Sequence, residues 1–389
     1  MGLYEKIHAM RAVNTHSHHM PDAFFKEMNL ETLLMNSYVS WCGLSPGESS
    51  ASRQAYLDAV RYKSYFVWLM KAVQKMYEIE EDLSPYNWDG YSKAIREANA
   101  DPAWHKAVLS VMCGYDKLIV DAYWEPGFCG DDKIFTSTFR IDALLFGYLK
   151  DAANHNGNGL FSLYGKKYTT IDTYMRFVRK LIREKAEGGC VALKCAMAYD
   201  RPIDFEKTTK AQASKAFSAP TPANIKRFQD YAFFQICKLA GELDLPVQVH
   251  TGLGQLKGTG AMNLHSVIEA HPNTKFVLFH GGFPWTGDVL ALLHNFPNVY
   301  ADICWLPLLS PTMAVTTLHA LIEVGTADKI CWGCDTWTSE ESLGARMAAD
   351  FVVNKTLEEK MRDGYLTQTD AMQLGENILR RNAKALYGL

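Results

Sequence analysis

The stretch from residue 12 to residue 18, AVNTHSH, places two histidines two positions apart at the end of a short run with strand character. Side chains two apart on a strand point to the same side, so His16 and His18 are expected to face one way together. Imidazole nitrogens suit zinc and other divalent ions as ligands. His19 points elsewhere on this alternation, and we interpret it as a loop residue. The stretch predicts a buried strand that ends in two candidate metal ligands.

Further apolar runs follow this strand, separated by stretches with helical periodicity. Most of the runs are apolar on both faces, as parallel strands buried beneath helices are. Eight such strands with intervening helices predict an α/β fold, a (β/α)8 barrel of the TIM type. The expected strands cover residues 12–16, 117–122, 138–144, 190–196, 246–251, 275–280, 299–304 and 329–335. The expected helices cover residues 170–187, 222–242, 264–270, 288–293, 313–324 and 340–354, with further helices in 361–389.

A long segment, from residue 20 to about residue 111, separates the first two expected strands, whereas such connections are normally short. It has helical periodicity of its own, notably over residues 52–77. Because it follows the first strand, it should emerge at the carboxyl-terminal face of the barrel, where active sites of this fold lie. Residues 201–222 should overhang the same face. We therefore predict one domain, 1–389, with residues 20–111 inserted as a helical cap.

Composition limits the possible partners. The 389 residues carry a formal charge of −3 with scattered basic residues, which argues against a surface for nucleic acid or membrane. The first residues lack the apolar core of a signal peptide, and we expect a cytoplasmic protein.

Nine cysteines are consistent with reduced thiols, and we interpret the Cys331–Cys334 CxxC as buried thiols in preference to a redox or zinc motif. The sequence allows a homo-oligomer without specifying one.

Three more ionisable residues follow apolar runs at the same predicted rim. His250 ends VQVH, His280 ends FVLFH, and Asp335 ends ICWGCD. Such a residue is costly in a core but suited to the rim of a barrel. The eighth strand lies beside the first when a barrel closes, which would bring Asp335 next to the paired histidines. A single histidine after a strand is more often a packed residue, but the coincidence of several at one rim favours a metal site.

The order HxH, Lys, two His and Asp resembles the amidohydrolase superfamily. Longer segments are similar to the branch that contains the amidohydrolase-like domains of glutamine-synthetase-fused proteins. That branch is related to uronate isomerases and aromatic-acid decarboxylases. The similar segments are RYKSYFVWLMKAVQKMYEI at 61–79, PAWHKAVLSVMCGYDKLIVDAYWEP at 102–126, TFRIDALL at 138–145, ALKCAMAYDRP at 192–202, VQVHTGLG at 247–254, FVLFHGGFP at 276–284, NVYADICWLPLLSP at 298–311 and CWGCDT at 331–336.

The resemblance implies that one divalent metal ion is held by His16, His18, His250 and Asp335. Zinc is the default for three imidazoles and one carboxylate, with manganese or nickel as alternatives. The resemblance further implies that Asp335 is catalytic and takes a proton from water activated by the metal. His280 would be the second catalytic residue, polarising the substrate or transferring a proton.

Lys194 ends the fourth strand, where a buried lysine needs an anionic partner or a modification. In two-metal relatives the corresponding lysine is carbamylated and bridges the two metal ions. We favour instead a cation that binds a substrate carboxylate, because the surrounding sequence resembles the single-metal branch. Arg140, Tyr199 and Arg201 could complete a site for a small acidic molecule, since arginine pairs with carboxylates. The alternative for Arg140 is a structural pair with Asp142 or Glu125.

The sequence therefore predicts a metal-dependent hydrolase that attacks a C–N or C–O bond of a small carboxylated substrate. One alternative is a non-hydrolytic enzyme on the same scaffold, either an aromatic-acid decarboxylase or a uronate isomerase; the latter are usually longer than this chain. A second alternative is a metal-binding scaffold without catalysis. Fold and ligands do not separate these functions, because function depends on the pocket.

Overall fold

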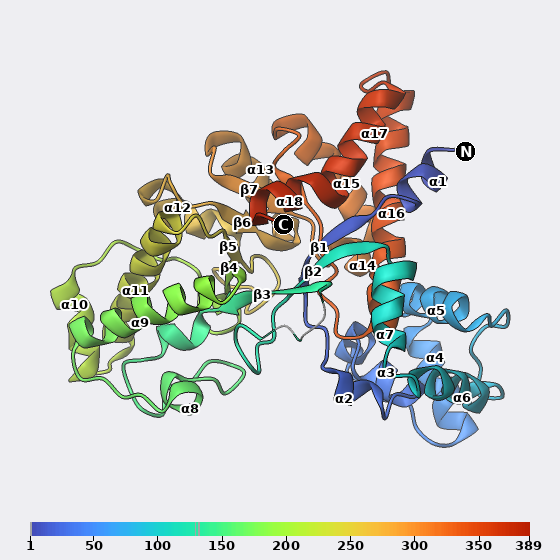
Figure 1. Cartoon of the computed structure of the whole chain (residues 1–389), viewed down its shortest axis with the longest axis horizontal. Helices are drawn as coiled ribbons and strands as arrows, with labels where there is room; N and C mark the ends of the chain where they lie inside the picture. Colours follow the sequence, from blue (N-terminus) through green and yellow to red (C-terminus); the bar gives the residue numbers. More distant parts are fainter. Residues whose placement is uncertain (1, 129, 131–132) are drawn as a thin grey trace.

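Eight parallel strands follow one another around a nearly closed barrel in the computed structural model, which describes residues 2–128, 130 and 133–389 (Figure 1). Each strand pairs with the next one in the sequence, and all seven recorded pairings are parallel. The barrel predicted from the sequence is confirmed. The strands are β1 (Ala12–Ser17), β2 (Tyr115–Val120), β3 (Phe135–Arg140), β4 (Cys190–Cys195), β5 (Val247–Val249), β6 (Phe276–Leu278), β7 (Val299–Asp302) and β8 (Ile330–Cys331).

The chain after β8 returns to β1 and joins the two edges of the sheet. The amide of Thr15 donates to the carbonyl of Trp332 at 3.3 Å, and the amide of Asp335 donates to the carbonyl of His16 at 2.8 Å. The amide of His18 continues the series with the carbonyl of Thr336 at 2.9 Å. Strand closure therefore brings the candidate site residues together.

Helices cover the outside of the barrel, and three of them begin after a residue whose side chain accepts a hydrogen bond from one of their first amides. Thr170, Thr221 and Ser310 each accept a hydrogen bond from the amide three residues on, and prolines occupy the first turn of the second and third of these helices. The helices are α8 (Leu160–Tyr164), α9 (Ile171–Glu187), α10 (Lys210–Ser214), α11 (Pro222–Glu242), α12 (His265–Ala270), α13 (Thr286–Asn295), α14 (Leu306–Leu309), α15 (Pro311–Val324), α16 (Ser339–Arg362), α17 (Gln368–Glu376) and α18 (Asn382–Tyr387).

Several strands end earlier than the sequence predicts. β3 ends at Arg140, and Asp142–Leu145 forms a 3-10 turn in which Asp142 accepts a hydrogen bond from the amide of Ala196 at 2.8 Å. His280 and Asp335 lie beyond β6 and β8 with φ of 65° and 62°. Left-handed backbone is incompatible with a strand, so these two residues turn out of the sheet.

Six α-helices lie between β1 and β2, gathered beside the barrel at the lower right of Figure 1. The expected helix over 52–77 is two helices, because the chain is extended at Lys63. Some apolar side chains of this segment, including Phe25 and Trp88, form a hydrophobic cluster separate from that of the barrel. The helices are α2 (Asp22–Phe25), α3 (Leu30–Met35), α4 (Ser50–Val60), α5 (Ser64–Tyr77), α6 (Trp88–Asn99) and α7 (Trp104–Ala107); α1 (Leu3–His8) precedes β1.

The described part of the chain contains no helix with the length and apolar character needed to cross a membrane.

Arg346 of α16 fastens this helix to the segments that lead into β1 and β2. Its side chain is buried and donates to Asp350 at 2.8 Å, to the Cys113 carbonyl at 3.2 Å and to the Met10 carbonyl at 2.7 Å. Arg346→Leu should lower the free energy of unfolding by about 3 kcal/mol, because it leaves these buried acceptors without their donor. Urea unfolding followed by circular dichroism measures the loss.

Lys355→Leu on the same helix is the control, since Lys355 pairs with Glu359 at the surface. It should change the free energy of unfolding by less than about 0.5 kcal/mol. Equal effects of the two variants would contradict the structural role of Arg346.

Candidate active site

A cavity of about 280 Å³ contains most of the residues that the sequence singled out. They come from β1, β3 and β4 and from the segments that follow β4, β5 and β8. The residues that line it from the sequence prediction are His16, His18, Arg140, Lys194, Tyr199, His250 and Asp335. The cavity therefore gathers side chains that lie far apart in the chain.

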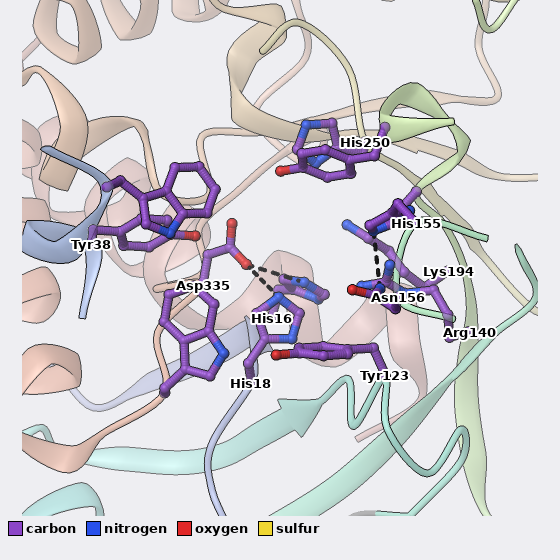
Figure 2. Close-up of a pocket in the computed structure, with 14 residues that line it drawn as sticks. His16, His18, Tyr38, Tyr123, Arg140, His155, Asn156, Lys194, His250 and Asp335 are labelled. Carbon is purple, nitrogen blue, oxygen red and sulfur yellow. Dashed lines mark hydrogen bonds and ion pairs between the residues drawn. The ribbon is translucent and has the colours of Figure 1, made fainter. Parts of the chain in front are cut away.

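His16 of β1, His18 directly after this strand and Asp335 form a tight cluster on one side of the cavity (Figure 2). The Nε2 atoms of His16 and His18 lie 3.3 and 3.1 Å from the same carboxylate oxygen, Oδ1 of Asp335. His16 and His18 are two residues apart, so their side chains face the same way, and the adjacency of β8 to β1 brings Asp335 beside them.

The hydrogen bonds of His18 show that a cation fits this cluster. Its Nδ1 lies 2.8 Å from the carbonyl oxygen of Asp121, so Nδ1 carries the hydrogen. In the neutral ring Nε2 then holds a lone pair directed at the carboxylate of Asp335. Two acceptors this close require either a proton or a metal ion between them. A histidine with its other nitrogen bonded to a carbonyl is also the usual form of a metal ligand.

The charge states of the cluster suit a metal. Burial, assisted by the charge of Lys194, lowers the pKa of His16 to about 3, so its imidazole is neutral at pH 7. Burial alone would raise the pKa of Asp335, but its contacts with His16 and His18 hold that pKa well below the ordinary value. The buried Nδ1 of His16 has no hydrogen-bond partner among the described residues. The donor set is thus neutral imidazole and ionised carboxylate.

His250 and His280 are paired with each other in place of joining this cluster. Nδ1 of His280 donates to the carbonyl of Cys304 at 3.0 Å, and its Nε2 lies 2.9 Å from Nδ1 of His250. The other nitrogen of His250 contacts the carbonyl of Leu253. His280 is fully buried and is not among the residues that line the cavity, and its Nδ1 is 4.0 Å from Asp335. The structure therefore leaves His250 across the cavity from His18 (Figure 2).

Asp121 lies beside the histidine pair and was missed by the sequence prediction. Its Oδ2 is 3.7 Å from Nε2 of His16, and these two residues and His18 form one potential metal-binding group in the described chain. A second such group combines His280, Cys304 and Asp335. Asp121 ends the apolar run KLIVD, the same pattern that identified Asp335, so the sequence held the signal.

Arg140 is held by two buried carboxylates. Its guanidinium lies 2.5 Å from Asp121 and 3.2 Å from Asp142. Burial alone would raise the pKa of Asp121, but Arg140 keeps it at about 2. The pair with Asp142 is the structural ion pair that the sequence analysis gave as the alternative role of Arg140. Arg140 also lines the cavity. Its charge is therefore largely balanced before any substrate arrives.

Lys194 faces the cavity without such a balance. It stands beside Arg140 in the sheet register, and no described residue forms an ion pair with it. Its ammonium lies 3.7 Å from the centre of the Phe279 ring. Burial, followed by the repulsion of Arg140, lowers the pKa of Lys194 to about 8. A buried cation in this position favours an anionic ligand.

Tyr199 reaches the cavity and Arg201 does not. The Tyr199 ring packs on His250 with centroids 4.5 Å apart. Arg201 pairs with Asp204 and Asp230, each at 3.0 Å, on the side of α11. The structure therefore places Arg201 in a structural ion-pair network and not with the other predicted substrate residues.

Further residues complete the walls of the cavity. Tyr38 and Trp41 come from the segment between β1 and β2, and Tyr123 and Trp337 follow β2 and β8. His155 and Asn156 come from the loop before α8. The inserted segment thus contributes directly to the walls of the cavity.

The family model described as Amidohydrolase matches residues 209–389. This part contains β5 to β8 with His250, His280 and Asp335, whereas His16, His18 and Lys194 lie before it. Protein fluG of Emericella nidulans is 30% identical over 151 residues, which are 37% of this chain. The aligned region is only 17% of fluG.

Solved structures similar to the whole chain have the same barrel. Glucuronate isomerase of Caulobacter crescentus has a TM-score of 0.76 at 15% identity, with 100% of this chain and 93% of that chain covered. Uronate isomerase of Thermotoga maritima has a TM-score of 0.74 at 17% identity, covering 99% and 96%. A candidate metal-dependent hydrolase of Lactobacillus casei has a TM-score of 0.71 at 15% identity, covering 99% and 97%. At these identities the likeness shows the fold alone.

We predict that His18→Ala and Asp335→Ala weaken metal affinity by more than about 100-fold, because even residues behind metal ligands change affinity 10- to 100-fold. Elemental analysis after dialysis against zinc measures the loss. His155→Ala is the matched control: it lines the same cavity but pairs with Asp200. Equal metal content in all three variants would show that the cluster is not the metal site.

Proposed function

We propose that the protein is a metal-dependent hydrolase, because residues 209–389 match the amidohydrolase family model and the chain has the fold of a candidate metal-dependent hydrolase. The bond attacked is a C–N or C–O bond of a small carboxylated substrate. One observation carries the proposal: the His16–His18–Asp335 cluster shares a cavity with Lys194, which has no ion-pair partner among the described residues. A candidate metal site and a candidate anion site thus lie within one small volume.

His16, His18 and Asp335 would hold the ion, with Asp121 adjacent and His250 as the further ligand that the family resemblance implies. When bound, zinc or a similar ion would supply Lewis acidity and make water a nucleophile near neutral pH. Asp335 is ionised, so it can accept the proton of the attacking water. His280 acts through His250, whose ring it holds by the contact between Nε2 and Nδ1.

Lys194 would bind the substrate carboxylate and orient the scissile bond toward Asp335. Arg140 supports this role, since it repels the ammonium and thereby favours an anion at the same place. Carbamylation of Lys194, with a second metal ion, is the alternative for this residue. The walls formed by Tyr38, Tyr123 and Trp337 would exclude water around the substrate.

Isomerisation is the second candidate, because two uronate isomerases share the fold over nearly the full chain. The match extends over 93% and 96% of those two chains. Decarboxylation of an aromatic acid rests on the sequence resemblance alone. The intact cluster disfavours a scaffold without catalysis.

Hydrolysis is tested with N-acyl amino acids and lactones of hydroxy acids in water enriched in ¹⁸O. We expect the zinc-loaded protein to release a carboxylate that contains one ¹⁸O atom, detected by mass spectrometry. Asp335→Asn should lower the rate by about 10²- to 10⁴-fold, because it removes the proton acceptor. Conversion of D-glucuronate to a ketose without hydrolysis of any amide or lactone would favour the isomerase instead.

The role of Lys194 predicts a pH dependence of KM. A pKa of about 8 means that the ammonium is charged below pH 8 and is lost above it, so KM should rise with pH above 8. Lys194→Met should raise KM about 10- to 100-fold at pH 7, because hydrogen bonds to charged groups are worth 1.5–3 kcal/mol.

Lys194→Arg is the matched variant, because its charge persists above pH 8 and KM should then vary little with pH. One metal ion should remain in Lys194→Met. A fall from two metal ions to one in this variant, with activity that depends on bicarbonate, would show a carbamylated lysine.

A further inference from the structure

His155 and Asn156 line the cavity on the side opposite Asp335 (Figure 2). They belong to the loop between β3 and α8, and no step of the proposed hydrolysis uses them. The side chain of His155 is about one quarter exposed, so a bound molecule can reach it. What the ring presents to the cavity depends on which of its nitrogens carries the hydrogen.

Asp200 determines the tautomer of His155. Oδ2 of Asp200 lies 2.8 Å from Nδ1 of His155. Oδ1 of Asp200 accepts a hydrogen bond from the backbone amide of His155 at 2.6 Å. A carboxylate only accepts hydrogen bonds, so Nδ1 must carry the hydrogen. The neutral ring then presents the lone pair of Nε2. The amide nitrogen of Asn156 already donates to this atom at 3.0 Å, as expected for an acceptor.

The loop holds this acceptor in a fixed position. Oδ1 of Asn154 accepts the backbone amides of Asn156 and Asn158 at 3.0 and 2.9 Å. The ring of His155 packs on Tyr199, with centroids 4.9 Å apart. Tyr199 in turn packs on His250, so the acceptor is positioned relative to the metal side of the cavity.

The same wall of the cavity holds two groups that can only donate, Lys194 and Arg140. A carboxylate satisfies these donors but offers nothing to Nε2 of His155. We propose that His155 is a specificity residue that accepts a hydrogen bond from a hydroxyl or amino group of the substrate. This group would replace the exposed amide of Asn156, because Nε2 has one lone pair. That the substrate carries a carboxylate rests on the proposed function. That it also carries a hydrogen-bond donor rests on His155 and Asp200.

The test uses pairs of acids that differ by one hydroxyl group: propionate and lactate, butyrate and 3-hydroxybutyrate, and phenylacetate and mandelate. Their affinity for the zinc-loaded protein is measured by isothermal titration calorimetry. In at least one pair the hydroxy acid should bind about tenfold more tightly, as one neutral hydrogen bond allows. His155→Leu should remove this advantage and leave the affinity of the parent acid unchanged.

Asp200→Asn tests the tautomer, because an amide at this position can donate to Nδ1 and turn Nε2 into a donor. This variant should also lose the advantage of the hydroxy acid, although the ring remains. The ¹⁵N chemical shifts of His155 should change from the Nδ1-protonated to the Nε2-protonated pattern. His155→Gln, which keeps an acceptor, should retain part of the advantage, and circular dichroism confirms folding of each variant.

Two outcomes overturn the proposal. The first is equal affinity within every pair, which includes the case in which none of the six acids binds. The second is an advantage of the hydroxy acid that survives in His155→Leu. Lys194→Met separates this proposal from the proposed function, since it should weaken both members of a pair equally. If both members bind Lys194→Met as they bind the wild type, the assigned carboxylate site is wrong. Loss of the hydroxyl advantage in His155→Leu would still support His155 in that case.

Discussion

The junction of β1 with the chain after β8 is the constraint on which both fold and site depend. The hydrogen bond from the amide of Asp335 to the carbonyl of His16, at 2.8 Å, is part of barrel closure. The side chains of the same two residues meet at 3.3 Å in the candidate metal cluster. A shift of strand register at this junction would therefore open the barrel and separate the cluster, so one set of contacts maintains both.

Backbone conformation around the cavity is costly at several places. His280, Trp305 and Asp335 adopt φ of 62° to 65°, which disfavours residues other than glycine by about 1–3 kcal/mol each. All three follow short strands, and the turn directs Asp335 toward the histidines of β1. The surrounding barrel maintains these conformations because its strands are buried on both faces. Stability elsewhere in the fold thus supports an arrangement that is locally unfavourable.

The sequence predicts the barrel and the His16–His18–Asp335 cluster because strand alternation and strand order determine them. It could also have identified Asp121, which ends an apolar run as Asp335 does. The orientation of His250 depends on side-chain torsions and on His280, which strand patterns do not encode. Arg201 is two residues from the cavity residue Tyr199 in the sequence, but ion pairs with Asp204 and Asp230 hold its side chain outside the cavity. His155 belongs to a loop without periodicity, so only the folded structure reveals its place opposite Asp335.

The segment between His18 and Asp121 supplies Tyr38 and Trp41 to the cavity without supplying any member of the cluster on β1 and after β8. Part of the cavity wall and the candidate metal cluster are thereby encoded in different stretches of the chain. Insertions or exchanges within this segment can reshape the substrate wall while the strand ends keep their geometry. The architecture is in this sense modular, because this wall of the cavity can change while the candidate metal cluster is kept.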